Sequence, residues 1–344
     1  MEEDDFETRA ERQRAAGEHA AALALYLRAW TSRDDEVAEK ILDLVEEWGD
    51  VDAALELTSA TAGAGNAAAY EALADLLIQC DRSEEAVSAL EEAARAGRDV
   101  TLWTGAVLAD EVGDRTRAEE YYRRALAENN PKALNDYGAF LMDDGERLDE
   151  AADLLRRAID QGDTMAAGNL GRLLVEKDGY EEALPWLRQA LDAGHRTVLV
   201  VLGEAENAAG DMEAAGTRLR EALAEDIPGA RFAYALHLAD NDSPREAVGY
   251  YEAAAEKDEE IAAYLNLAIL HDELEEWEQA DRRYRDAIEH QDELAFVNYA
   301  RFLSEQGRGG EIGALLAPAA ELDLDLEDMT ELRALAEGKS TDES

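Results

Sequence analysis

Cysteine is almost absent from this chain of 344 residues, and its single copy, Cys80, excludes an internal disulfide. Proteins of the cytoplasm keep their thiols reduced, so we expect a cytoplasmic location. The sequence has no run of 18 apolar residues, which excludes a transmembrane helix. The N-terminal stretch Met1–Arg14 is acidic and has no apolar segment, so we expect no signal peptide.

Lysine is also rare, with 5 copies, and lysine and arginine together number 33 against 81 acidic residues. The resulting net charge of −48 repels phosphate backbones and anionic lipid surfaces. We therefore expect neither direct nucleic-acid binding nor membrane association. The same charge favours a basic protein partner, although high solubility or a salty host cytoplasm would explain the composition equally.

Motifs that carry chemistry are missing as well. The sequence contains no G-x-x-x-x-G-K-[S/T], no H-E-x-x-H and no C-x-x-C. The 5 histidines are far apart and do not have the spacing of metal ligands. We therefore predict no catalytic residue, no cofactor and no metal site, and the chain is not expected to be an enzyme.

Proline (5 copies) and aromatic residues (6%) are sparse, and much of the 47% hydrophobic content is alanine. This composition favours an all-α protein, because alanine is the best helix former and proline the worst.

A small–large–small pattern recurs every 32 or 33 residues. A small residue opens the second helix of each predicted unit, and the ten positions are Ala22, Ala54, Ala86, Ala118, Ala151, Ala183, Ala215, Ala247, Ala280 and Ile312. Four residues later comes a large residue in nine units, as Leu187, and seven residues later a second small one, as Ala190. Small residues let neighbouring helices approach closely while the large residue fills the gap between them. Unit two is weaker, because threonine occupies positions 58 and 61.

Each unit is predicted to be a hairpin of two amphipathic helices, as Thr164–Gly194 illustrates. Asp163 or Thr164 can cap the first helix, and Lys177-Asp178-Gly179 breaks the helical pattern. Glycine supplies the unusual backbone angles of such a turn. Five further units have glycine there: Gly17, Gly49, Gly113, Gly210 and Gly307.

The two ends differ from the interior of the array. Asp4-Asp5 can start the first helix, and Asp325 can cap a terminal helix over 326–337 whose Met329, Leu332 and Leu335 would cover the last unit. Residues 338–344 are expected to be a disordered tail. In the tenth unit, Pro318 should kink the second helix.

The pattern resembles the tetratricopeptide repeat family, with some Sel1-like character. The resemblance covers about residues 4–322 and is carried by Asn169-Leu170-Gly171, Tyr264–Ala268, Gly210-Asp211 and the alanine columns. Pro131 and Pro228 stand in turns where the family prefers proline. The resemblance implies a right-handed α-α superhelical solenoid of about ten repeats with a C-terminal capping helix, in one domain over 1–337. It also implies that first helices line a concave groove and that the protein is a non-enzymatic scaffold.

On that layout, arginines gather on second helices and acids gather at the C-terminal ends of first helices. The candidate groove residues are Trp103, Asp110, Glu111, Asn169, Arg172, Glu176, Asp272, Glu273, Asn298 and Arg301. An acid at a helix C-terminus opposes the helix dipole, which suggests that the acids serve a purpose other than stability. Two interpretations remain open: the acids form a binding surface for a basic peptide, or they are solvated and pair locally, Glu111 with Arg115 and Glu305 with Arg308. Units three and seven do not have such an acid.

Three functions remain open from the sequence. The first is a scaffold or adaptor that binds an extended, basic segment of a partner protein in the groove. The second is an acidic sensor or inhibitor that occupies the basic, nucleic-acid-binding site of a target enzyme. The third is an enzyme with an unrecognised pocket between units two and three. The sequence does not determine an oligomeric state.

Overall fold

The computed structural model describes residues 5–30, 35–143, 145–241, 243–322, 324 and 326–338. This part of the chain is built of helices and the turns between them, and it contains no β-strand. The chain divides into two compact units, Met1–Asp163 and Thr164–Ser344. The all-α repeat architecture is therefore confirmed, whereas the single domain over 1–337 stays a prediction.

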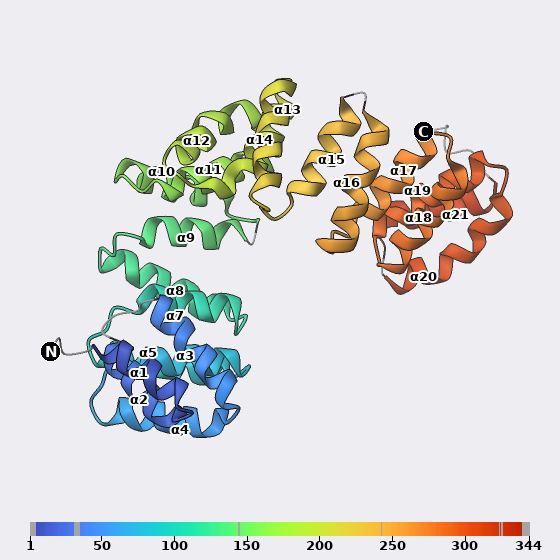
Figure 1. The fold of residues 1–344 in the computed structure, drawn as a ribbon. Helices are drawn as coiled ribbons and strands as arrows, with labels where there is room; N and C mark the ends of the chain where they lie inside the picture. The colour runs from blue at the N-terminus through green and yellow to red at the C-terminus, as the bar shows by residue number, and fades with distance from the viewer. Residues whose placement is uncertain are drawn as a thin grey trace. The chain divides into compact units, whose positions relative to one another are not determined.

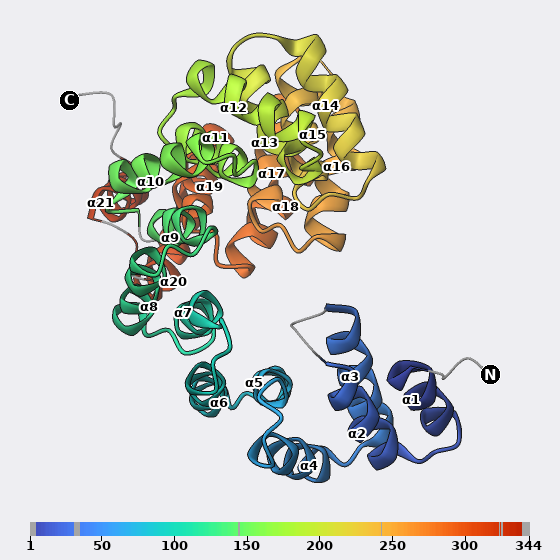
Figure 2. The same ribbon diagram turned by 90° about the vertical axis from the view of Figure 1, so that its left-hand side faces the viewer.

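In residues 1–163 the helices follow one another in chain order from α1 to α10 (Figure 2). They are α1 (Phe6–Ala15), α2 (His19–Ala29), α3 (Asp35–Trp48), α4 (Val51–Gly63), α5 (Ala69–Gln79), α6 (Ser83–Arg95), α7 (Thr101–Asp110), α8 (Arg115–Ala127), α9 (Ala133–Met142) and α10 (Leu148–Asp160). Odd-numbered helices are the first helices of the predicted units and even-numbered helices are the second ones. The partners of each hairpin pack closely except α3 and α4, which touch only sparsely.

Residues 164–344 continue the same alternation and end with a terminal helix (Figure 1). The elements are α11 (Met165–Glu176), α12 (Tyr180–Asp192), the 3₁₀ helix η1 (Arg196–Val198), α13 (Leu199–Ala208), α14 (Met212–Ala224), α15 (Ala230–Asp240), α16 (Pro244–Lys257), α17 (Ala262–Glu273), α18 (Trp277–Glu289), α19 (Glu293–Glu305), the 3₁₀ helix η2 (Gly309–Leu315), α20 (Leu316–Glu321) and α21 (Leu326–Ala336). The terminal helix α21 buries Met329 and Leu332 against the last unit, as predicted.

The predicted small–large–small columns form the core. All ten opening residues, from Ala22 to Ile312, have no exposed surface. The large residues between the small ones are also buried, except the half-buried Leu316. In the weak unit two, Thr58 is fully buried and its hydroxyl donates to the carbonyl of Ala54 at 2.8 Å, which satisfies the polar group inside the helix.

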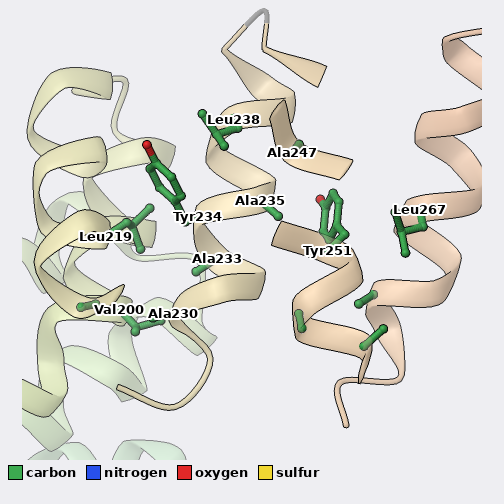
Figure 3. Packing of buried hydrophobic residues seen from close by; sticks show 14 of the residues in the cluster. Val200, Leu219, Ala230, Ala233, Tyr234, Ala235, Leu238, Ala247, Tyr251 and Leu267 are labelled. Carbon is green, nitrogen blue, oxygen red and sulfur yellow. The ribbon is translucent and has the colours of Figure 1, made fainter. Parts of the chain in front are cut away.

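The large residues of the second helices pack against small residues of the first helices. Figure 3 shows Tyr251 of α16 between Ala235 of α15 and Leu267 of α17, all of them buried. In four units the small residue is glycine, and a Cβ atom at Gly171 would lie only 2.5 Å from the Cγ and Cδ2 atoms of Leu187. These helices therefore approach more closely than an alanine at this position would permit.

The turns inside the hairpins use the left-handed backbone region. All five predicted turn glycines have positive φ angles, between 70° and 84°. Three other units have Asp81 (φ 56°), Asp178 (φ 57°) and Glu275 (φ 59°) at the corresponding place. A residue with a side chain is strained in this region, by about 1–2 kcal/mol.

We expect Glu275→Gly to stabilise the protein by about 0.5–1 kcal/mol, because relief of the strained turn exceeds the added flexibility of the unfolded chain. Denaturant unfolding measures the change. Glu275→Gln keeps the strain and removes the charge, so it should change the stability much less. A lower stability for Glu275→Gly than for Glu275→Gln would contradict the account.

Several local predictions are tested at the helix ends. The backbone N–H of Thr8 donates to Asp5 at 2.8 Å, so Asp5 caps α1 as predicted. Thr164 precedes α11 but does not cap it, because its hydroxyl is hydrogen-bonded to His195 Nε2 at 2.9 Å. The single kinked helix predicted for unit ten is instead divided into η2 and the short α20, and Pro318 lies in the first turn of α20, where proline is tolerated.

Three predictions fall on residues 4, 325 and 339–344, which lie outside the described residues. None of the helices in the described part of the chain combines the length and the apolar character needed to cross a bilayer.

Candidate partner-binding face

In seven first helices, α7, α9, α11, α13, α15, α17 and α19, one side reaches solvent, and three positions at spacing i, i+3, i+7 define it. We call these positions the first-helix face. They are Trp103, Ala106 and Asp110 in α7; Asp136, Ala139 and Asp143 in α9; Asn169, Arg172 and Glu176 in α11; Val201, Glu204 and Ala208 in α13; Ala233, Leu236 and Asp240 in α15; Asn266, Ile269 and Glu273 in α17; and Asn298, Arg301 and Glu305 in α19. The third position is exposed in all seven helices, whereas the first is half-buried or buried. Eight of the ten candidate groove residues lie on this face, and Glu111 and Asp272 are next to it in sequence.

Cavities open on the first-helix face. In residues 1–163 a cavity of about 710 Å³ is lined by Trp103 and Ala106 of α7 and by Asp136 of α9. Its wall also includes Glu71, which is 3% exposed and accepts a hydrogen bond from Arg98. The residues that line this cavity belong to units three to five, whereas the sequence suggested a pocket between units two and three.

Two of the cavities in the unit formed by residues 164–344 are lined by two or more residues of the first-helix face. One, of about 360 Å³, lies between α13 and α15 and is lined by Glu204, Leu236 and Asp240 of the face. The other, of about 120 Å³, includes Asn169 and Arg172 of α11. Hollows on the same side of the first helices are the kind of surface that accepts side chains of a partner.

The acids at the C-terminal ends of the first helices lie close to one another. Burial raises the pKa of Tyr284, and the charges of Asp272, Glu305 and Glu273 raise it further. Acids of two successive first helices, α17 and α19, therefore lie near enough to one buried tyrosine to influence it. We call Asp240, Asp272, Glu273 and Glu305 the acidic row.

The same arrangement recurs at two other tyrosines. Burial raises the pKa of Tyr251, with smaller effects of Asp240 and Glu273. In residues 1–163, burial likewise raises the pKa of Tyr122, and the charges of Asp110, Asp136 and Asp143 add to the effect.

Among the residues that the structure describes, none of the four acids of the acidic row forms an ion pair. Burial raises the pKa of Asp272, and Glu305 and Glu273 raise it further. Within the described part of the chain, Asp272 forms no ion pair. Arg308 pairs with Glu311 at 2.7 Å and with Asp281 at 2.6 Å, so the predicted local pair with Glu305 is wrong.

Two arginines near α8 are instead bound to an acid of that second helix. Arg123 and Arg147 both contact Glu119, at 2.8 and 2.6 Å, and Tyr137 donates to the same carboxylate. Burial alone would raise the pKa of Glu119, but the hydrogen bonds from Tyr137 and Arg147 lower it overall. In the other candidate local pair, Arg115 donates to the carbonyl of Phe140 and lies 4.3 Å from the centre of its ring.

The two Asn-x-x-Arg pairs differ in their environment. Arg172 donates to Asn169 at 2.6 Å. Arg301 is held by Glu331 of α21 through two bonds of 2.7 and 2.8 Å, and Asn298 donates to the carbonyl of its own helix at Leu294. Arg301 is therefore engaged by the capping helix, which the local spacing did not indicate.

Sequence reasoning missed Glu204 and His237, which line the 360 Å³ cavity. His237 is 8% exposed and its Nδ1 is hydrogen-bonded to Asn207 Oδ1 at 2.8 Å. The alignment of the repeats could have identified Glu204, because Glu204 occupies the same position in α13 that Arg172 occupies in α11. Among the described residues, no group of three His, Cys, Asp or Glu side chains is arranged to hold a metal ion.

Comparisons with known proteins agree with the repeat pattern. A tetratricopeptide repeat model matches residues 104–166 and 169–230, and a second model of the same description matches residues 263–296. A search of curated proteins finds no match to the chain. The Sel1-like character is not confirmed.

Solved structures share the fold at low sequence identity. A human IFIT1 dimer with PPP-AAAA is 16% identical with a TM-score of 0.58, covering 92% of this chain and 85% of its own. The APC/C hetero-tetramer Cut9-Hcn1 is 12% identical with a TM-score of 0.55, covering 96% of this chain and 75% of its own. Taken with the buried small–large–small columns and the hairpin turns, the two family models show that residues 104–166, 169–230 and 263–296 of this chain consist of tetratricopeptide repeats.

Proposed function

We propose that this chain is a protein-interaction scaffold whose first-helix face binds an extended, basic segment of a partner protein. Tetratricopeptide repeats support the general role of a scaffold. The observation that supports a basic partner is the acidic row, whose member Asp272 lies beside Glu273 and Glu305 and has no ion pair in the described part of the chain.

The placement of these acids is unfavourable for the isolated protein. Glu273 ends α17 and Glu305 ends α19, where a negative charge opposes the helix dipole at a cost of about 0.3–1 kcal/mol each. A cationic segment laid along the face would offset both the dipole effect and the mutual repulsion. Exposed charges of this kind increase the association rate in a manner that depends on salt.

We expect Asp272→Asn combined with Glu273→Gln to weaken the binding of a basic peptide roughly three- to tenfold, because two favourable ion pairs are lost. The probe is a fluorescently labelled peptide with alternating arginine, lysine, glycine and serine, measured by anisotropy at low and high salt. The salt dependence should become shallower in the variant.

Glu278→Gln combined with Glu289→Gln is the matched control, because these two exposed acids belong to α18 of the same hairpin. The control should retain the affinity. The acidic-row variant should also be slightly more stable than the wild type, since it removes charges that oppose a helix dipole. Equal losses of affinity in both variants would show that only net charge matters and would contradict the proposal.

No observation on the described residues favours the alternative of an acidic inhibitor that occupies a nucleic-acid-binding site. Competition with DNA or RNA for a common target would distinguish it, because a scaffold that uses its own face does not need to compete.

A further inference from the structure

The cavity of about 360 Å³ between α13 and α15 combines apolar walls with a carboxylate. Its lining residues are Val175, Tyr180, Glu204, Asn207, Ala208, Leu219, Ala233, Leu236, His237 and Asp240. It lies at unit seven, which is one of the units without an acid at the C-terminal end of its first helix. Glu204 precedes the C-terminal end of α13 by one helical turn, and its side chain lines the cavity.

Glu204 has no partner among the residues that the structure describes. It is half-buried, and in the described part of the chain it makes no hydrogen bond and no ion pair. Burial alone raises the pKa of Glu204. The hydroxyl of Tyr180, which also lines the cavity, donates to Asp178 at 3.0 Å.

The nearby positive groups do not neutralise Glu204. Burial, followed by the charge of Arg220, lowers the pKa of His237, which favours the uncharged imidazole. Arg188 is bound to Glu206 on a different side of α13, at 2.9 Å. The cavity therefore presents a partly desolvated negative charge, and the exposed carboxylate of Asp240 lies at its rim.

We propose that this cavity is the subsite for one arginine side chain of the basic segment, an inference that rests on the proposed function. Val175, Ala208 and Leu236 would cover the methylene stem, and the carboxylate of Glu204 would accept two hydrogen bonds from the guanidinium. A guanidinium is more weakly hydrated than an ammonium and matches a carboxylate with two parallel bonds, so arginine is favoured over lysine.

Methyl NMR spectroscopy of the full chain tests this inference. The probes are N-acetyl-arginine methylamide, the corresponding lysine compound and the neutral citrulline analogue. We expect the arginine compound to shift the methyl signals of Val175, Leu219 and Leu236, with methyl groups of residues 1–163 as internal reference. Citrulline should produce no saturable shift at these methyl groups, and lysine should bind more weakly than arginine.

Glu204→Gln should reduce the affinity for the arginine compound about tenfold, the loss expected for one charge-assisted pair. Its thermal stability should be unchanged or higher, because the variant removes a partly desolvated charge, and this measurement excludes misfolding. Glu213→Gln, an exposed acid of α14, is the matched control and should bind as the wild type does. Equal binding of citrulline, tighter binding of lysine, or unchanged affinity in Glu204→Gln would overturn the inference.

The outcome also separates this inference from the proposed function. If the labelled basic peptide loses affinity in the acidic-row variant but not in Glu204→Gln, the arginine subsite is wrong and the basic-segment scaffold stands. If neither variant changes the affinity for the peptide, the proposed function itself fails.

Discussion

Gly171→Ala is expected to destabilise the protein by about 1–2 kcal/mol, although alanine is the better helix former. The new Cβ would lie 2.5 Å from the Cγ and Cδ2 atoms of Leu187, well inside the usual contact distance. Leu187 has no exposed surface and Gly171 is buried in the middle of α11, so neither side can move away freely. Overpacking of a core costs about 1–3 kcal/mol, and a contact of 2.5 Å belongs to the upper part of this range, so about 1–2 kcal/mol remains after the gain of about 1 kcal/mol in helix propensity.

The sign of this effect should reverse when Leu187 is shortened. Leu187→Ala by itself removes a buried large side chain and should cost about 2–5 kcal/mol. In that background, Gly171→Ala no longer meets a side chain and should stabilise the protein by about 1 kcal/mol. Denaturant unfolding of the two single variants and the double variant measures the coupling between the sites.

Gly249 provides the control for helix propensity. It lies exposed in the interior of α16, and an added Cβ would meet nothing within 4 Å. Gly249→Ala should therefore stabilise the protein by about 0.5–1 kcal/mol. If Gly171→Ala behaved like Gly249→Ala, the close approach of α11 to α12 would not limit the size of the residue.

The second large effect concerns a buried acid in α13. Glu206 is 1% exposed, and its carboxylate lies 2.9 Å from Arg188 and 3.9 Å from Arg218. Replacement of both arginines by methionine would leave this carboxylate buried without a cation. We expect a loss of about 3–5 kcal/mol, the usual cost of an uncompensated buried charge.

Removal of the acid should be far less harmful. Arg188 and Arg218 are 49% and 32% exposed, so both guanidinium groups can be solvated after Glu206→Leu. A buried ion pair replaced by an apolar side chain of similar volume is often neutral in stability. We therefore expect Glu206→Leu to change the free energy of unfolding by about 1 kcal/mol or less.

A control must allow for the overall charge of −48, since the loss of two arginines increases the repulsion throughout the chain. Arg196 and Arg283 belong to more exposed pairs, with Glu225 and Glu252. Arg196→Met combined with Arg283→Met has the same charge change and should cost about 1 kcal/mol. Equal losses in the two double variants would show that net charge, and not the burial of Glu206, governs the stability.

These two predictions bear on the function because both sites lie behind the first-helix face. A Cβ added at Gly171 would meet Leu187 of α12, and the carboxylate of Glu206 contacts Arg188 of the same helix. Arg172 and Glu204, in contrast, belong to the first-helix face. Variants at the former positions should change stability, and variants at the latter should change binding.

Much of the fold was readable from the sequence because the determinants are local and repeated. The spacing of small and large residues predicted which side of each second helix is buried, and all ten opening positions have no exposed surface. The five turn glycines were recognisable because only glycine adopts positive φ at little cost. The capping helix was also predictable, since an apolar stripe must be covered where the array ends.

The partners of polar side chains were not readable in the same way. Thr164 has the residue type of a helix cap, yet its hydroxyl contacts His195, 31 residues away. Arg301 has the spacing of a groove residue, yet Glu331 of the capping helix holds it from 30 residues away. Both contacts join different elements, and no local pattern specifies them.

By itself the sequence therefore determined the helices, their buried sides and the repeat family, because each depends on residues within one period of 32 or 33 positions. Only the tertiary structure decided which acids have counter-ions and where the first-helix face is hollowed. A long charged side chain can reach several elements, and which one it contacts depends on how the hairpins stack. The unpaired Glu204 became apparent only once α13 and α15 were seen to enclose it.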